Sequence, residues 1–209
     1  FQELLGDVAM SKKQNKEALG YYEKAIKMQP DYFRPHVQSG IALNNLGRKS
    51  EAESYLNKSN ELLPTAPSYY LLGHFAEDRG DVNTAMQHYE MAAESDSEIG
   101  KSSVERYTRL DLPRNPAKYL QSGAQMDGQG NVFAVVQNPT TATVTRVQVR
   151  LVRYDPATSK PVAQSQPLLI AANIASNQRG QVAVAGVKLT SQAELSQYGV
   201  TIEKAELAK

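Results

Sequence analysis

The first half of the sequence repeats itself with a period of 33 or 34 residues. Three kinds of position recur at this spacing: a glycine, an alanine, and a large apolar or aromatic residue. They are Gly6, Gly40 and Gly73, then Ala18, Ala52 and Ala85, and then Tyr22, Leu56 and Tyr89. A repeat of this length is typical of helical hairpins that stack side by side, because one hairpin cannot bury its apolar face alone. The sequence therefore predicts a stacked helical array.

Each predicted repeat consists of two helices joined by a turn. The repeats span residues 1–31, 32–64 and 65–97, and a capping helix covers 97–110. We expect the glycine and alanine of each repeat to let its two helices approach closely, and the large residue to fill the space between hairpins. Asp31 and Thr65, each with a proline shortly after it, are predicted to cap the following helices.

This spacing resembles that of the tetratricopeptide repeat family over about residues 1–97. The resemblance implies that the first helix of each hairpin lines a concave groove that binds a protein or peptide segment. The candidate groove residues are Arg34, Gln38, Ile41, Asn44, Asn45, Tyr70, Leu71 and His74, beside Asp7, Ser11, Gln14 and Glu77. Asparagine can hydrogen-bond a peptide backbone and Arg34 can hold a carboxylate, although these residues could also be plain solvated helix faces. The family's basic clamp for chaperone tails is not reproduced, because Asp7 and Ile41 stand where it needs other chemistry.

An apolar stripe lies at the start of the first repeat. It consists of Phe1, Leu4, Leu5 and Val8, and no preceding repeat covers it. We therefore expect that the full-length protein continues upstream. In the chain as given, we expect the stripe to drive self-association.

A different pattern begins after the helical repeats. Two prolines, Pro113 and Pro116, interrupt the helical periodicity, so residues 111–118 are predicted to be a linker. From there the apolar period changes to two, as in 146–151, where valine and leucine alternate with arginine and glutamine. Further strands are predicted at Asn131–Gln137, Leu168–Ala171, Gln181–Val187 and Val200–Leu207, with a weaker one at Tyr119–Met126 and a short helix at Ser191–Glu194. Residues 119–209 are thus predicted to form an immunoglobulin-like or fibronectin-like β-sandwich, which makes the chain a multidomain α plus β protein.

Composition narrows the choice of partners. The net charge of +1 divides into −4 for residues 1–112 and +5 for residues 113–209, and the basic residues of the second part occur singly along strands. This distribution does not predict a nucleic-acid partner. The absence of cysteine excludes disulfides and thiolate metal sites but leaves the compartment open. No apolar run is long enough for a membrane span.

No combination of residues predicts catalysis, a metal or a cofactor. The three histidines, His36, His74 and His88, lack the one-turn spacing of a zinc peptidase helix, and no G-x-S-x-G sequence is present. Glu77 and Asp78 are expected to be solvated charges rather than calcium ligands. The glycines of 128–130 precede a strand, so we expect a hairpin turn there and no phosphate site.

The whole arrangement is similar to the C-terminal part of bacterial envelope zinc metallopeptidases of the β-barrel-assembly-enhancing type, without their peptidase domain. The similarity rests on the linker 111–116 and on Gln137-Asn-Pro-Thr140 ahead of a valine-rich strand. It implies a non-catalytic scaffold in the periplasm or cell envelope, linked to proteolysis or assembly. Two alternative functions remain. The chain could be a free-standing adaptor or lipoprotein in secretion, pilus or outer-membrane assembly, or its β-domain could bind carbohydrate or cell wall. The alternative location is the cytoplasm. The few scattered aromatic residues of that domain do not favour carbohydrate binding.

Overall fold

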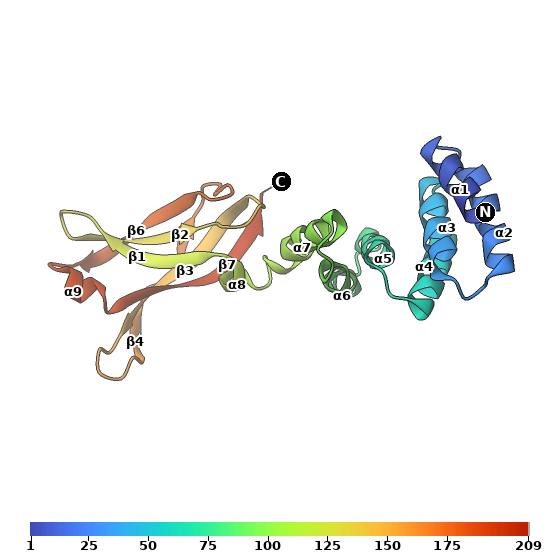
Figure 1. Ribbon diagram of the computed structural model, residues 1–209. Coiled ribbons are helices and arrows are strands. Elements are labelled where there is room, and N and C mark those ends of the chain that lie inside the picture. Colours follow the sequence, from blue (N-terminus) through green and yellow to red (C-terminus); the bar gives the residue numbers. More distant parts are fainter. Residues whose placement is uncertain (209) are drawn as a thin grey trace. The chain divides into compact units, whose positions relative to one another are not determined.

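The computed structural model describes residues 1–208. The chain divides into two compact units, a helical one that spans Phe1–Tyr107 and a β-rich one that begins at Thr108 (Figure 1). The predicted α plus β fold is confirmed, since helical repeats are followed by two β-sheets. The division between the units lies within the last long helix.

The first unit is built of paired antiparallel helices. Their bounds are α1 Gln2–Ser11, α2 Asn15–Met28, α3 Phe33–Asn45, α4 Lys49–Leu62, α5 Ala66–Asp78, α6 Val82–Ala93 and α7 Glu98–Asp111. The first six helices form the three predicted hairpins, and α7 lies where the capping helix is predicted. Gly47 and Gly80 end α3 and α5 with φ of +75°, a conformation that glycine adopts without steric cost. Lys13 holds the corresponding place in the first hairpin with φ of 59°.

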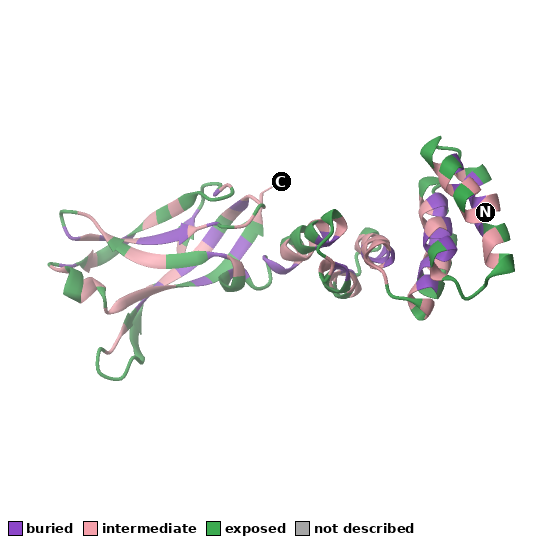
Figure 2. Ribbon diagram, viewed as in Figure 1, coloured by how far each residue is buried: buried purple, intermediate pink, exposed green. Residues whose placement is uncertain are grey.

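Close packing at the repeated glycines holds each hairpin together. Tyr22, Leu56 and Tyr89 are fully buried, and each lies against the glycine on the other helix of its own hairpin. The prediction that these large residues fill the space between hairpins is therefore corrected, because they fill the gap that each glycine leaves within its hairpin. Figure 2 shows the resulting buried stripes along the helices.

One of the two predicted caps is confirmed. Thr65 caps α5 by accepting a hydrogen bond from the Ser68 amide at 3.4 Å. Asp31 does not cap α3, because the Tyr32 amide bonds back to the Gln29 carbonyl at 3.3 Å and prolongs the turn. The helix consequently begins at Phe33, with Tyr32 at the cap position and no side-chain cap.

The second unit is a two-sheet sandwich with short helices α8, Pro116–Tyr119, and α9, Gln192–Leu195. The strands are β1 Gln121–Met126, β2 Asn131–Gln137, β3 Val144–Tyr154, β4 Pro161–Gln164, β5 Leu168–Ile170, β6 Arg179–Lys188 and β7 Tyr198–Leu207. One sheet has the order β1-β2-β6, and in the other β3 pairs with β7 on one side and with β4 and β5 on the other. All of these pairs are antiparallel. The sequence prediction missed β4, and it was wrong about Tyr119, which ends α8 because Pro116 opens a helical turn there.

A single apolar core lies between the two sheets. Alternate residues of β3, namely Val147, Val149 and Leu151, are buried as the period-two pattern predicts. Asn138 is also fully buried, but all of its hydrogen-bonding capacity is used: its Nδ2 donates to the carbonyls of Ala142 (2.7 Å) and Ile174 (2.9 Å), and its Oδ1 accepts from Thr140. This amide holds the loop after β2 against the edge of the core.

Candidate functional site

Of the predicted groove residues, Asp7 and Ser11 lie on α1 and Gln14 precedes α2. The eight main candidates lie on the first helices of the second and third hairpins. Helix α3 carries five of them and α5 carries the other three. The opposite side of each helix is buried against its hairpin partner, as Val37 and Leu43 show for α3 and Phe75 for α5. We call the half-buried side chains Gln38, Ile41, Asn44, Tyr70 and His74 the α3/α5 face.

Arg34 lies beside this face but is already paired. Its Nε is 2.9 Å from Glu3 Oε1 and its Nη2 is 3.3 Å from Asp7 Oδ2, and its side chain remains 49% exposed. Asp7 also accepts a hydrogen bond from the Tyr22 hydroxyl at 2.9 Å. Arg34 therefore ties α3 to α1, and a carboxylate from a partner would have to compete with Glu3 and Asp7 for it.

A second charged cluster lies at the other side of the face. Glu77 of α5 accepts hydrogen bonds from the Tyr89 hydroxyl (2.7 Å) and from Arg106 Nη1 of α7 (2.9 Å). Burial and this carboxylate raise the pKa of the Tyr89 phenol. The first and third repeats thus share one device, in which a buried tyrosine of the second helix donates to an acid of the first helix.

The middle repeat lacks this device. Leu56 stands where the other repeats have tyrosine, so the second hairpin has no hydroxyl to hold an acid. In place of acids it presents amides. Within residues 1–208, the Gln38 and Asn44 side chains make no hydrogen bond to another residue. The α3/α5 face is therefore an uncharged strip with free amides, flanked by two ion-pair clusters.

The remaining predicted groove residues have more limited roles. The Asn45 amide donates to Asn15 Oδ1 at 3.3 Å and so helps to join the first two hairpins. Leu71 packs against the apolar core of the helical unit. These two side chains contribute to packing within the array. The five side chains of the α3/α5 face are therefore the candidates for contact with a partner.

His74 adds a titratable group to the face. Its ring contacts Tyr70 edge-on, with the ring centroids 5.0 Å apart. Burial, helped by the positive charge of Arg106, lowers the pKa of His74 below its ordinary value. This shift favours the neutral imidazole, which serves as a hydrogen-bonding and stacking group.

The rest of the described chain, up to residue 208, offers little for other kinds of site. In this part of the chain no three histidine, aspartate or glutamate side chains gather in a metal-binding arrangement. The glycines of 128–130 form the turn between β1 and β2, where Asp127 accepts from the Gln129 and Asn131 amides. None of the described helices combines the length and the apolar character that a membrane crossing requires.

Comparison with known proteins agrees with this architecture. A family model for the tetratricopeptide repeat matches residues 2–32 and 66–99. The two matched segments coincide with the first and third hairpins of the helical unit. The second repeat lies between the matched segments.

Two solved structures are similar to this chain. The tetratricopeptide domain of Sgt2 from Aspergillus fumigatus shares 20% identity with it, over 61% of this chain and 87% of that one, with a TM-score of 0.48. The tetratricopeptide domain of P58(IPK) shares 18% identity over 56% of this chain and 34% of that one, with a TM-score of 0.50. At these identities the likeness concerns the fold alone. No curated protein matches the chain significantly.

Proposed function

We propose that this chain is a non-catalytic scaffold and that the α3/α5 face binds an extended segment of a protein partner. The observation that carries the proposal is the pair of free amides, Gln38 and Asn44, on a half-buried strip between two charged clusters. Half-buried amides without a partner lose part of their hydration, so they favour a ligand that supplies backbone donors and acceptors.

The neighbouring side chains suggest the chemistry of the bound segment. Ile41 and Tyr70 offer apolar area for a side chain of the partner, and aromatic anchors contribute strongly at interfaces. Arg34 can exchange Glu3 and Asp7 for a carboxylate of the partner, because its side chain is half exposed. The expected ligand is an extended peptide with an apolar residue at its centre and an acidic residue toward α1.

The test uses a phage-displayed library of random peptides, selected on the immobilised chain. A selected peptide is then synthesised and its affinity is measured by isothermal titration calorimetry. Replacing Gln38 and Asn44 together by alanine removes two neutral hydrogen bonds, each worth about 0.5–1.5 kcal/mol, so affinity should fall roughly 5- to 150-fold. The matched control is Lys58→Ala on α4, which should bind as the parent does. Equal affinity for the double variant would show that the α3/α5 face does not bind the peptide.

We also propose that the chain acts in a bacterial cell envelope, as the C-terminal part of a protein linked to proteolysis or assembly. The support is the linker 111–116 and the β unit with its Gln137-Asn-Pro-Thr140 loop. Fractionation of cells that make the full-length protein should place it in the envelope fraction. Recovery in the cytoplasmic fraction would refute this location and favour a cytoplasmic adaptor.

Self-association through the first helix is a further expectation. Phe1, Leu4 and Val8 are 88%, 66% and 50% exposed, whereas Leu5 is half-buried. Sedimentation velocity should show a concentration-dependent dimer for the parent and a monomer for Leu4→Lys, because a charge in an apolar contact is costly. Val104→Lys, at an apolar position on α7 that is 50% exposed, should dimerise as the parent does. A parent that remains monomeric at high concentration would rule this expectation out.

A further inference from the structure

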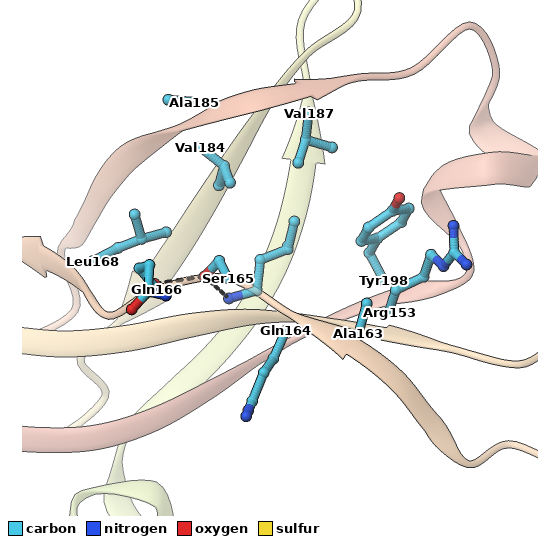
Figure 3. A pocket seen from close by; sticks show the side chains of 11 residues that line it. Arg153, Ala163, Gln164, Ser165, Gln166, Leu168, Val184, Ala185, Val187 and Tyr198 are labelled. Carbon is cyan, nitrogen blue, oxygen red and sulfur yellow. Dashed lines mark hydrogen bonds between the residues drawn. The ribbon is translucent and has the colours of Figure 1, made fainter.

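The β unit contains a cavity of about 430 Å³ at one edge of the sandwich. Its apolar lining includes Leu151, Leu168, Val184 and Val187, which approach it from both sheets. Figure 3 shows Leu168, Val184 and Val187, and it also shows Tyr198 and Arg153 at the same cavity. The residues of β4 and β6 that border the cavity belong to the outermost strands of their sheets.

The cavity forms because the two sheets approach each other closely along only one part of this edge. Near Gly180, β5 lies so close to β6 that a methyl group would meet Ile170 and Ile174 at 2.6–2.8 Å. Farther along β6, Gly186 has φ of +76°, and the register with β2 is broken between Asn131 and Phe133. This bulge carries residues 184–187 out of the ladder, and on the facing sheet β5 begins only at Leu168.

Two strand edges therefore flank the cavity. No strand pairs with the outer side of β4 or of β6 among the described residues. An edge strand presents a row of backbone N–H and C=O groups that can pair with an added strand. A peptide that entered between them could bond to either edge while its side chains alternate between the cavity and solvent.

Arg153 gives this opening a charge. It lies opposite Ala163 of β4 and Tyr198 of β7, so the three side chains share the face of the sheet that also carries Leu151. Arg153 is exposed, and no ion pair or hydrogen bond of its side chain is present among residues 1–208. Arg150, in contrast, is held by Glu203 and by the Ser165 carbonyl.

We propose that this edge binds a second ligand, an acidic extended peptide that adds as a strand between β4 and β6. A large apolar side chain of the peptide fills the cavity, and a carboxylate near it pairs with Arg153. The sign of the charge supports an acidic partner, since residues 113–209 carry a net charge of +5. The free strand edges favour a peptide over a lipid, because an alkyl chain would leave them unpaired.

The test is a peptide selection on the full chain, designed so that peptides that bind this edge are separated from peptides that bind the α3/α5 face. A phage-displayed random peptide library is selected on the parent and counter-selected on Ala163→Trp, which fills the mouth of the cavity from an exposed position. The surviving sequences should alternate apolar and polar residues and contain an acid. Circular dichroism and thermal unfolding establish that the variant folds like the parent.

A charge exchange then tests Arg153. A selected peptide should bind Arg153→Glu at least about tenfold more weakly, as expected for loss of a charge-assisted bond. Its analogue with lysine in place of the acid should bind that variant better than the parent. The proposal fails if counter-selection leaves no enriched sequence or if Arg153→Glu binds unchanged. It also fails if the cavity binds laurate and no peptide. A dimer of the parent that is lost in Ala163→Trp would likewise refute the proposal, because the occupant would then be a second copy of the chain.

Discussion

Replacing Gly40 by alanine should lower the free energy of unfolding of the helical unit by about 2 kcal/mol. The new methyl group would lie 2.6 Å from two atoms of Leu56, a side chain with no exposed area. Overpacking of this kind costs about 1–3 kcal/mol or more, which outweighs the gain of up to about 1 kcal/mol from the better helix propensity of alanine.

The same substitution at Gly20 is the matched control. Gly20 lies inside α2, and nothing lies within 4 Å of the added methyl group. Gly20→Ala should therefore stabilise the chain by about 0.5–1 kcal/mol. Urea unfolding followed by circular dichroism measures both changes. A neutral or stabilising Gly40→Ala would contradict the close packing inferred at the hairpin glycines.

Replacing Asp111 by alanine should destabilise the β unit by about 3 kcal/mol. The carboxylate is buried and accepts hydrogen bonds from Tyr119 (2.6 Å), Asn115 (2.6 Å) and Lys118 (3.0 Å). Hydrogen bonds to a charged group are worth about 1.5–3 kcal/mol each, and the donors recover part of this from water where they are exposed. Glu206→Ala should change stability by less than about 1 kcal/mol, since its ion pair with Arg146 lies in solvent.

Asp111 also makes the unit sensitive to acid. Burial favours the neutral acid, but the bonds from Tyr119, Asn115 and Lys118 outweigh it and hold the pKa of Asp111 below its usual value. Its stabilising contribution is therefore complete above the unfolded pKa of about 3.9 and is lost as the pH falls through the folded pKa. The parent should lose more stability below about pH 4 than Asp111→Asn does. Parallel pH profiles for the two proteins would show that this carboxylate is not stabilised by folding.

The repeat architecture could be predicted from the sequence because its causes are local and periodic. The spacing of Gly40 and Leu56 fixes which faces of two consecutive helices meet, and alternation from Val147 to Leu151 marks a half-buried strand. The strand β4 could not be predicted, since all four of its residues are exposed and no alternation marks it. Tyr119 was misassigned because Pro116 opens a short helical turn that ends at this residue.

The candidate sites show the same limit. The sequence places Gln38 and Asn44 on one helix, but it does not reveal that Arg34 meets Glu3 and Asp7. That pairing depends on how α1 and α3 lie in the stack. The cavity at Arg153 was missed entirely, because it results from a bulge in β6 and from the start of β5 only at Leu168. In the sequence, the bulge is marked locally by Gly186, which adopts a positive φ in the structure.

The central claim, that the α3/α5 face holds a partner segment, can be tested most directly by site-specific photo-crosslinking. The photoreactive residue p-benzoylphenylalanine is placed at Ile41, at Lys58 on the second helix of the same hairpin, or at Ala163 on β4. Each protein is irradiated with the peptide that was selected on the parent and that loses affinity when Gln38 and Asn44 are replaced. We expect a crosslinked product from Ile41 and none from Lys58 or Ala163. A product from Lys58 or Ala163 in the absence of one from Ile41 would contradict the claim.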